Sequence, residues 1–384
     1  MDKECPASIV NYMINCPYFK KCGSCAYATD DYEKSLRLKI AKIHKLFPEQ
    51  KEIELLPSKP YHYRHKVIYS FFTDKKGEIK AGLYSENSHR IVEIKDCLLH
   101  SKESLAIIDD VLKLANSFKL TAFNDRTYKG LLRHLQIRTS YSDRKVLLTF
   151  VLGDMVFKGS SNFISELVKK HGEIVGIIFN YNNRHTSVVL GQKEKTVYGR
   201  PFLRDKMGPL TFEITSKSFY QVNPEVAYKI YQDAIELSEI KDTDTVLDAY
   251  CGTGTISLFA AQRAKRVVGV EINDSAVMSA KKAKRLNMID NVTFICSDVI
   301  DYMQKERFDV VFTDPPRSGM SVGFIKTLLK IKPSRIVYIS CNPETMKRDL
   351  SLFKDQYYIG NIKFYDQFAF TDHLESLVLL KRKR

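Results

Sequence analysis

The chain has 384 residues, of which 44% are hydrophobic, and its formal net charge is +15. This length suggests two or three domains with an ample core. No run approaches the roughly 20 apolar residues of a membrane span, and the N-terminal residues lack the apolar core of a secretory signal. The excess of cations favours a polyanionic partner such as nucleic acid, although it also serves solubility. We therefore expect a cytoplasmic protein.

The first segment of interest is a group of cysteines near the N-terminus. Four of the eight cysteines lie within the first 25 residues. A reducing compartment disfavours disulfides, so such a group indicates metal binding or catalysis. The pattern Cys16-x5-Cys22-x2-Cys25 brings three thiols into one short loop. Zinc and an iron–sulfur cluster both accept such ligands. Cys5 falls outside the pattern.

The next segments alternate between helical and β-rich patterns. Residues 31–47 carry apolar residues at helical spacing and precede Pro48, which predicts a helix. Short β-rich runs such as KVIYSFF, LQIRT and VLLTFVL follow between residues 61 and 215, with helical segments near 101–118 and 160–171. This order predicts an α+β domain with an antiparallel sheet.

After about residue 216 the pattern changes to strand–helix alternation. TVLDAYCGTGTISLFAA reads as strand, tight turn and helix, and further short apolar strands follow in RVVGVE, VTFICSD, DVVFTDPP and RIVYISC. This alternation predicts a doubly wound, mostly parallel α/β sheet with a Rossmann-like arrangement. Ligands of such sheets bind at the carboxyl ends of the strands. The residues just after each strand are therefore the candidates for a functional site.

The first of these turns contains two glycines, Gly252 and Gly254. A dinucleotide fingerprint needs a third glycine where Ser257 stands, so the pattern does not favour NAD. Glu271, at the end of the next strand, could accept both ribose hydroxyls of an adenosine. Asp298, after the third strand, could accept from the adenine amino group. Alternatively, Glu271 faces a helix dipole and Asp298 caps a helix.

The last of these strands ends in ISCNPETM, with Cys341 just after the strand. Most lone cysteines are buried core thiols. A cysteine at the open end of a parallel sheet can instead act as a nucleophile, and Pro343 would fix the turn after it. These residues alone leave both interpretations open.

The motifs LDAYCGTG, VVGVE and FTDPPR resemble those of class I S-adenosylmethionine-dependent methyltransferases. DPPR followed by SCNP and HLES, together with SFYQVNP at 218–224, resembles the RNA (uracil-C5)-methyltransferase family over essentially the whole chain. The resemblance implies transfer of a methyl group from S-adenosylmethionine to uridine. We expect cofactor contacts from Gln221, Tyr250, Gly252, Thr255, Glu271, Asp298 and Asp314.

The chemistry of this family explains the catalytic residues that the resemblance implies. Carbon 5 of uracil is a poor nucleophile until a thiolate adds to carbon 6, and a base must later remove the proton from carbon 5. Cys341 matches the attacking thiol and Glu375 the general base, with Asp314 near both the cofactor and the target base. His373 is the weaker candidate for the base. Glu375 can reach the carboxyl edge only if the chain turns just before it.

The cysteine pattern resembles the iron–sulfur branch of the family. Cys97, in IVEIKDCLLH, matches the fourth ligand, so Cys16, Cys22, Cys25 and Cys97 are expected to hold a [4Fe–4S] cluster rather than zinc. Only 15 residues precede Cys16, so the RNA-binding β-barrel of many relatives, the TRAM domain, is expected to be absent. This short form indicates a uridine of 23S rRNA, with the tRNA T-loop as the alternative.

RNA contacts are expected from Arg64, Lys66 and Phe219. Arg64 and Lys66 lie in YHYRHK, a mixture of aromatic and cationic residues that suits looped RNA, although a strand of mixed exposure looks the same. Phe219 could stack on a flipped uracil or pack in the core. The rival interpretations are a methyltransferase acting on an exocyclic nitrogen and a non-catalytic RNA-binding protein. No obligate protein partner is inferred, and a monomer is expected.

The sequence therefore predicts three parts. Residues 1–60 form an iron–sulfur loop and linking helix, and residues 61–215 form a central α+β RNA-binding domain. Residues 216–384 form the methyltransferase domain.

Overall fold

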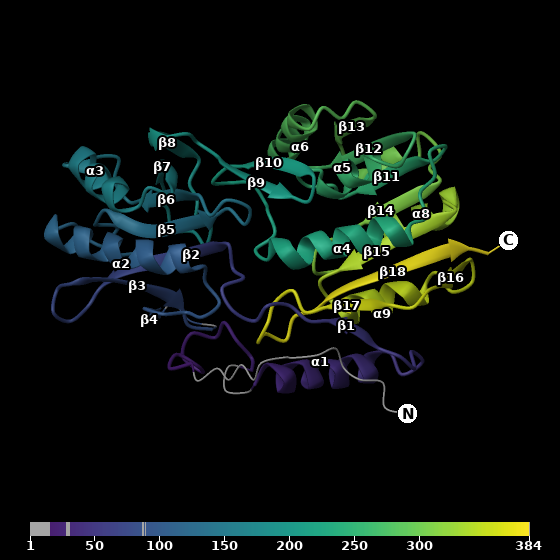
Figure 1. The fold of residues 1–384 in the computed structure, drawn as a ribbon, viewed down its shortest axis with the longest axis horizontal. Helices are drawn as coiled ribbons and strands as arrows, with labels where there is room; N and C mark the ends of the chain where they lie inside the picture. Colours follow the sequence, from purple (N-terminus) through teal and green to yellow (C-terminus); the bar gives the residue numbers. More distant parts are fainter. Residues whose placement is uncertain (1–15, 28–30, 87, 89, 384) are drawn as a thin grey trace. The chain divides into compact units, whose positions relative to one another are not determined.

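The computed structural model describes residues 16–27, 31–86, 88 and 90–383 (Figure 1). Cys5 lies outside these residues. The chain forms two compact units, each built from separate stretches of sequence. The C-terminal unit takes the described residues of Met1–Pro17, Cys25–Pro60 and Val226–Arg384, and the central unit takes Tyr18–Ser24 and Tyr61–Glu225. The three-part division at residues 60 and 215 stays a prediction.

The C-terminal unit is built on a nine-stranded sheet. Five neighbouring strands are parallel: β13 (Val292–Cys296), β12 (Arg266–Glu271), β11 (Thr245–Ala249), β14 (Val310–Thr313) and β15 (Arg335–Ser340). The sheet continues through β18 (Glu375–Arg382), β17 (Lys363–Tyr365) and β1 (Glu54–Leu56), with β16 (Tyr357–Ile359) also paired to β18. β18 runs antiparallel to β15. The last strand therefore reverses direction relative to the parallel set.

Helices cover both faces of this sheet (Figure 1). One face shares a core with α1 (Tyr32–Leu46), α7 (Val299–Met303), α8 (Val322–Ile331) and α9 (Pro343–Ser351). The other face carries α4 (Pro224–Leu237), α5 (Thr255–Ala261) and α6 (Asp274–Leu286). The predicted strand–helix alternation is confirmed, and the order of the parallel strands is that of a doubly wound fold. No helix within the described residues is long and apolar enough to cross a bilayer.

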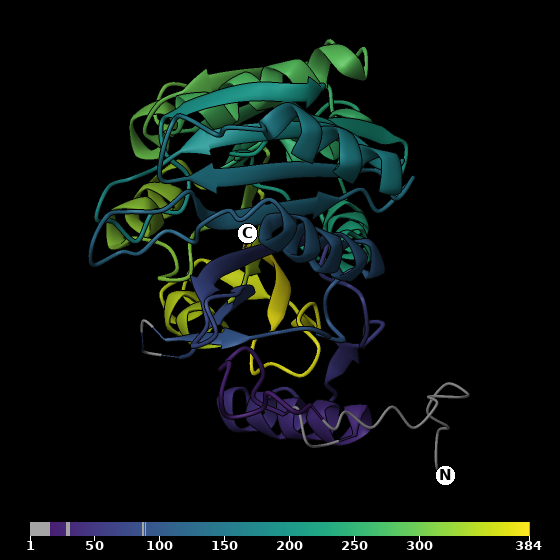
Figure 2. The same ribbon diagram turned by 90° about the vertical axis from the view of Figure 1, so that its left-hand side faces the viewer.

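The central unit contains a seven-stranded sheet. Its order is β4 (Ile91–Glu93), β3 (Ile79–Tyr84), β2 (Lys66–Thr73), β5 (Leu132–Thr139), β6 (Val146–Leu152), β7 (Ile174–Tyr181) and β8 (Lys193–Gly199). A separate hairpin consists of β9 (Leu203–Met207) and β10 (Leu210–Ile214). The two helices α2 (Lys102–Ser117) and α3 (Ser160–Lys170) pack on the sheet and on each other (Figures 1 and 2).

The prediction of an antiparallel sheet is wrong for one pair of strands. β6 and β7 run parallel, whereas their neighbours in the sheet are antiparallel. The physical reason is that the chain leaves the end of β6, returns through α3 to the side where β6 began and enters β7 there. The two strands therefore run in the same direction.

A buried ion pair closes the amino end of the C-terminal sheet. Arg335, at the start of β15, lies 2.7 Å from the Asp244 carboxylate, and both side chains are nearly buried. Arg335 also donates to the carbonyl oxygens of Ser238 and Glu239 after α4. Asp244 accepts from the Lys241 backbone amide at 2.8 Å. This network ties α4 to the sheet at the edge opposite the carboxyl ends of the parallel strands.

We expect Arg335→Leu to destabilise the protein without removing its activity. The change leaves the Asp244 carboxylate buried without its cation, which costs about 3–5 kcal/mol of unfolding free energy. Denaturant unfolding would measure this loss, and the double variant R335L/D244L should recover most of it. A single variant as stable as the wild type would contradict the role given to this pair.

Candidate active site

The candidate site lies at the carboxyl edge of the C-terminal sheet. Asp314 directly follows β14, and Cys341 directly follows β15. Since β14 and β15 are parallel neighbours, the two residues leave the sheet at the same edge. Ser340 pairs with Ser376 across β15 and β18, so Glu375, the first residue of β18, lies beside the end of β15. The turn that the sequence could not show is therefore present.

Two carboxyl groups share this edge in a desolvated setting. Glu375 is buried, and burial together with the charge of Asp314 raises its pKa well above the ordinary value. Burial also raises the pKa of Asp314 to about 7. Two neighbouring carboxyl groups that are both removed from water disfavour simultaneous ionisation. The pair therefore holds at least one proton near neutral pH.

The Cys341 thiol responds to the same surroundings. Burial, followed by the charges of Glu375 and Asp314, raises its pKa to about 11, while the Arg317 guanidinium acts in the opposite direction. The thiol is therefore protonated in the unliganded site. Only the thiolate is strongly nucleophilic, so the thiol must lose its proton to a neighbouring group during reaction.

The loop after β14 and the start of α9 frame the thiol. Asn342 caps α9 by accepting from the Glu344 amide at 3.1 Å, and its side-chain amide donates to the Arg317 carbonyl oxygen at 3.3 Å. Arg317 also approaches His373, with Nη2 and Nδ1 3.4 Å apart. His373 thus belongs to the contacts that join two loops. This placement suits a histidine that orients a loop.

The glycine turn after β11 has the backbone that its sequence requires. Tyr250, Gly252 and Gly254 have φ values of 62°, 53° and 81°. A Cβ at Gly254 would lie 2.5 Å from the Phe294 ring, so close packing excludes other residues there. A Cβ at Gly252 would meet nothing within 4 Å. The backbone at Gly252 therefore borders open space that a ligand can enter.

The carboxylates of Glu271 and Asp298 both accept hydrogen bonds from neighbouring backbone amides. Glu271 accepts from the backbone amides of Gly252 at 3.2 Å and Asn273 at 2.9 Å. Each of its oxygens keeps a further lone pair, so it can still accept from ribose hydroxyls. Asp298 is the N-cap of α7 and accepts from the Ile300 amide at 2.7 Å, as the capping alternative predicts. Its side chain is exposed and retains capacity to accept from a ligand.

Two other predicted cofactor residues flank this region. Burial, together with the charge of Asp298, raises the pKa of Tyr250 to about 12, which indicates that the two side chains are neighbours. The Tyr250 ring packs against Phe324 at a centroid distance of 5.2 Å. Thr255 is the first residue of α5 and is half-buried.

Two further residues at this edge were given no role in the sequence analysis. Asp248, fully buried in β11, accepts from the Ser257 hydroxyl at 2.6 Å, and burial raises its pKa to about 7. Its position inside an otherwise apolar strand could have indicated it. Ile272 is 73% exposed and offers an apolar surface beside Glu271. No spacing or motif signals this residue.

The other predicted contacts belong to the central unit. Phe219 is 67% exposed, so the core-packing alternative is wrong. Arg138 of β5, which is buried, donates to the carbonyl oxygens of Ser216 and Ser218 and so holds the segment that leads to Phe219. Gln221, which follows in the same segment, also lies in the central unit and is half-buried.

The two predicted RNA-binding cations lie at the start of the central sheet. Lys66 opens β2 opposite Arg138, and burial together with the Arg138 charge lowers its pKa to about 8. Arg64 is half-buried, and its backbone amide donates to Leu99 at 2.9 Å.

The four predicted cluster cysteines are divided between the units. Cys22 and Cys97 belong to the central unit, and Cys16 and Cys25 to the C-terminal unit. Cys22 is close enough to Cys97 for its charge to raise the Cys97 pKa, although burial is the main cause of that rise. Backbone amides of Leu99 and His100 act in the opposite direction. Within the described part of the chain, no three His, Cys, Asp or Glu side chains are arranged to hold a metal ion.

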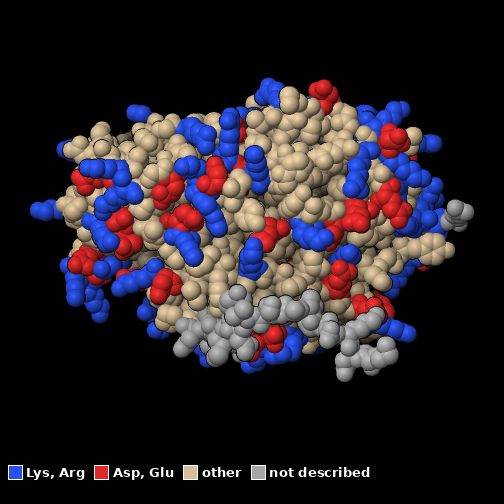
Figure 3. All heavy atoms as spheres, in the orientation of Figure 1, with Lys and Arg blue, Asp and Glu red and all other residues tan. Residues whose placement is uncertain are grey.

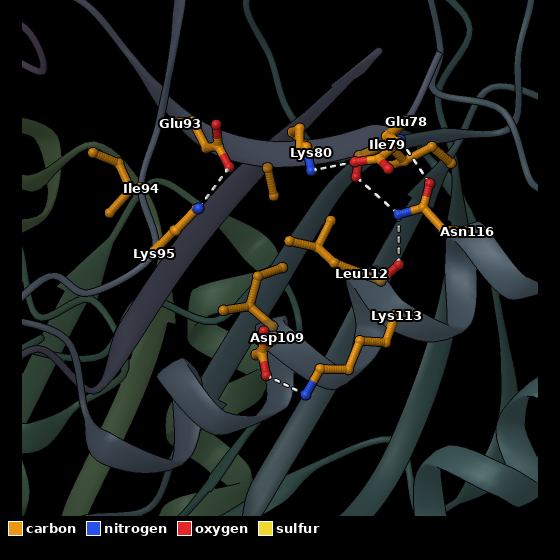
Figure 4. A pocket seen from close by; sticks show the side chains of 12 residues that line it. Glu78, Ile79, Lys80, Glu93, Ile94, Lys95, Asp109, Leu112, Lys113 and Asn116 are labelled. Atoms are coloured by element: carbon orange, nitrogen blue, oxygen red, sulfur yellow. Dashed lines mark hydrogen bonds and ion pairs between the residues drawn. The ribbon is translucent and has the colours of Figure 1, made fainter. Parts of the chain in front are cut away.

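A cavity of about 440 Å³ in the central unit is a separate feature (Figure 4). It lies between β3, β4 and α2 and contains none of the predicted site residues. Each of its lysines has an acidic partner: Lys80 with Glu78 at 2.6 Å, Lys95 with Glu93 at 3.8 Å and Lys113 with Asp109 at 2.6 Å. These pairs neutralise the charge around the cavity.

On the face shown in Figure 3, the distribution of surface charge does not indicate where a polyanion would bind. Lys and Arg side chains are spread over this face and interleaved with Asp and Glu rather than gathered in one patch. The positive net charge therefore supports a general attraction to polyanions and does not locate a binding site.

Comparison with known proteins agrees with the geometry of this edge. A family model described as tRNA (Uracil-5-)-methyltransferase matches residues 191–383. An uncharacterised RNA methyltransferase of Staphylococcus epidermidis is 34% identical, covering 96% of this chain and 83% of the relative. One from Halalkalibacterium halodurans is also 34% identical over the same shares.

A solved structure extends the likeness to the fold. The tRNA (uracil-54, C5)-methyltransferase of Pyrococcus abyssi, crystallised with S-adenosyl-L-homocysteine, has a TM-score of 0.80 to this chain. It is 26% identical, and the match covers 93% of this chain and 85% of that one.

A second family model, described as DNA methylase, matches residues 55–282. It includes the glycine turn and Glu271 but ends before Asp314, Cys341 and Glu375. The uracil-5 model includes all three residues. Together with the relatives matched over nearly its full length, this coverage shows that the chain belongs to the tRNA (uracil-5-)-methyltransferase family of RNA methyltransferases.

Proposed function

We propose that this enzyme methylates carbon 5 of a uridine in 23S rRNA, with Cys341 as nucleophile and Glu375 as general base. The observation that carries the proposal is the antiparallel pairing of β18 with β15, which sets Glu375 beside the end of the strand that Cys341 follows. Asp314 leaves the neighbouring strand at the same edge. A nucleophile and a proton acceptor are the two groups that this reaction requires of the protein.

In the first step the Cys341 sulfur bonds to carbon 6 of the uracil. The thiol proton passes to the Asp314 carboxylate, whose raised pKa makes it a better proton acceptor than an exposed carboxylate, while Glu375 is kept for the last step. The electrons of the C5–C6 double bond move toward O4 and give an enolate. The Arg317 guanidinium, which favours the charged form of the thiol, assists this step.

In the second step carbon 5 of the enolate takes the methyl group of S-adenosylmethionine, and S-adenosylhomocysteine leaves. One proton of the pair first passes to water, which leaves Glu375 ionised. Glu375 then removes the proton from carbon 5, the C5–C6 double bond returns and the bond from carbon 6 to the Cys341 sulfur breaks. The departing thiolate takes a proton back from the pair, which restores the resting thiol. A carboxylate in a desolvated site is a stronger base than one in water, which suits this proton removal.

The cofactor would occupy the open side of the glycine turn. Glu271 would accept from the ribose hydroxyls, and Ile272 and Asp298 would border the adenine. Tyr250, Gly252, Thr255 and Asp314 follow β11 or β14, which are parallel neighbours, and are assigned to the same cofactor. From the central unit, Gln221 is assigned to the cofactor, and Phe219, Arg64 and Lys66 to RNA. The exposed ring of Phe219 supports stacking on a flipped base.

The choice of 23S rRNA rests on the cysteine pattern, which resembles the iron–sulfur branch of the family. The alternative is the tRNA T-loop, because the matching family model and the Pyrococcus abyssi enzyme are both named for tRNA. Labelled S-adenosylmethionine with unmodified total RNA, followed by size fractionation and nucleoside analysis, tests both. Labelled 5-methyluridine in large-subunit rRNA would support the proposal, and the same nucleoside only in tRNA would overturn the substrate.

The nucleophile and the base are tested separately by trapping. RNA containing 5-fluorouridine has no proton to lose from carbon 5, so it should hold the enzyme in a covalent adduct after methyl transfer. We expect Cys341→Ala to form no adduct on a denaturing gel. Glu375→Gln should form the adduct on ordinary uridine RNA and release it slowly, with turnover reduced about 10²–10⁴-fold.

The control for this pair is Glu49→Gln, which alters an exposed glutamate far along the chain from the site. It should match the wild type in both assays. Full turnover by Cys341→Ala would contradict the mechanism.

We further propose that Cys16, Cys22, Cys25 and Cys97 hold a [4Fe–4S] cluster, to which no step of the reaction is assigned. The proximity of Cys22 to Cys97 and the amides that favour the Cys97 thiolate suit two of the four ligands. Anaerobically purified protein should contain about 4 iron atoms per chain. Cys97→Ser should lose iron and visible absorption. A colourless wild type containing one zinc would contradict the cluster.

The proton held by the carboxyl pair predicts a dependence of stability on pH. Asp314 has a pKa of about 7 in the folded protein, so the folded state keeps a proton that the unfolded state releases above about pH 4. Its contribution therefore falls as pH rises from about 4 to 7, by at most about 1.4 kcal/mol per pH unit. Denaturant unfolding of the wild type and Asp314→Asn at pH 5, 6 and 7 would measure this difference. Parallel curves would contradict the raised pKa.

A further inference from the structure

Helix α1 places a lysine in the core of the C-terminal unit. Lys39 lies on the buried stripe that also holds Tyr32, and its side chain is 0% exposed. Its ammonium group donates to the Asp366 carboxylate, to the Phe368 carbonyl oxygen at 3.1 Å and to the His373 carbonyl oxygen at 2.9 Å. An ammonium group has three donors, so all of them are used.

All three acceptors belong to one loop. Residues 366–374 connect β17 to β18, and the next residue is Glu375. The other oxygen of Asp366 accepts from the Tyr32 hydroxyl at 2.6 Å, so α1 holds this carboxylate twice. The Tyr32 hydroxyl in turn accepts from the Ser58 amide at 2.8 Å. The start of the loop is therefore fixed to the segment that carries α1.

The middle of the loop is held by a second group of contacts. The carbonyl oxygen of Phe370 accepts from the backbone amides of Ala26 at 2.9 Å and Tyr27 at 3.0 Å. Phe370 has a φ of 62° and lies 5.5 Å from the Tyr32 ring. A bulky residue adopts this backbone only where its surroundings impose it. The loop therefore has a defined shape, and Lys39 contacts both its first residue, Asp366, and its penultimate residue, His373.

A buried lysine is costly as a means of stability alone. Removing two charges from water costs several kcal/mol for each ion, and an apolar pair of similar volume often gives an equally stable core. What an apolar pair cannot do is fix two backbone carbonyl oxygens at chosen points. The Lys39 network therefore serves to fix the positions of backbone carbonyl oxygens rather than to increase the free energy of unfolding.

We propose that Lys39 is a positioning residue for Glu375, because it holds Asp366, Phe368 and His373 so that the loop delivers the Glu375 carboxyl to the edge where Cys341 follows β15. This inference rests on the proposed function. Lys39 touches neither reacting atoms nor cofactor in this role. It acts through the loop, and its effect should therefore appear only in the step that needs Glu375.

The proposed reaction separates that step from the others. Attack by Cys341 and methyl transfer precede proton removal, and 5-fluorouridine RNA stops the reaction after them. The rate of adduct formation on 5-fluorouridine RNA therefore reports the early steps, and turnover on uridine RNA reports proton removal as well. A merely structural defect would reduce both rates by the same factor.

The test is Lys39→Met, which keeps the length of the side chain and removes its donors. We expect turnover on the uridine form of a 23S rRNA transcript to fall about 10- to 100-fold, since a displacement of about 1 Å can cost about 10²-fold. Adduct formation on the 5-fluorouridine form should stay within about twofold of the wild type, and a covalent intermediate should accumulate on the uridine form. The matched control is Lys45→Met, an exposed lysine of the same helix, which should leave both rates unchanged.

Two further variants separate positioning from stability. In K39M/D366N the unpaired buried charge is removed. Most of the decrease in melting temperature caused by Lys39→Met should therefore be recovered, while turnover stays low. Tyr32→Phe removes the second contact to Asp366 together with the bond from the Ser58 amide, and leaves the Lys39 contacts in place. It should give a smaller loss of the same kind, which keeps the test available if Lys39→Met does not fold.

The outcomes are distinct. If K39M/D366N recovers turnover together with melting temperature, or if Lys39→Met slows both rates equally, Lys39 has a structural role only and the inference is wrong. If the wild type forms no adduct on 5-fluorouridine forms of either 23S rRNA or tRNA transcripts, the proposed function itself fails. If only the tRNA forms react, the same comparison of rates is made on them.

Discussion

The antiparallel pairing of β18 with β15 is the constraint on which the candidate site depends. In a sheet of parallel strands alone, the start of a strand lies at the edge away from the ligands. Reversal of β18 moves its first residue to the carboxyl edge, where Glu375 joins Asp314 and Cys341. The glycine turn after β11 opens toward the same edge. One change of strand direction thus assembles groups that are far apart in the sequence.

The same placement has an electrostatic consequence. Two carboxyl groups and a thiol are removed from water together, and each group disfavours ionisation of its neighbours. The unliganded site therefore keeps its thiol protonated at neutral pH. A substrate that excludes the remaining water and brings donors toward O4 would change this balance. In the proposed mechanism, the reactivity of Cys341 then depends on what is bound, because the thiol is not permanently ionised.

Much of this arrangement could be predicted from the sequence, and the reasons are local. Glu271 ends an apolar strand, and Asp314 and Cys341 directly follow apolar strands. Their positions could be predicted, because parallel strands share one carboxyl edge. Glu375 could not be placed in this way, since its position depends on a reversal made by the preceding loop. Lys39 could not be found either: it occupies a core position of a helix, and its partners lie more than 300 residues later. Ile272 carries no pattern of its own.

The early part of the chain has its partners at the far end of the sequence. α1 packs against the loop before β18, and β1 pairs with β17 through Glu54 and Lys363. During synthesis these first elements emerge long before the strands that complete their surface. Contacts so distant in sequence form slowly, and exposed apolar surface promotes aggregation in the meantime. We expect the C-terminal unit to reach its folded state only after β17 and β18 have emerged from the ribosome.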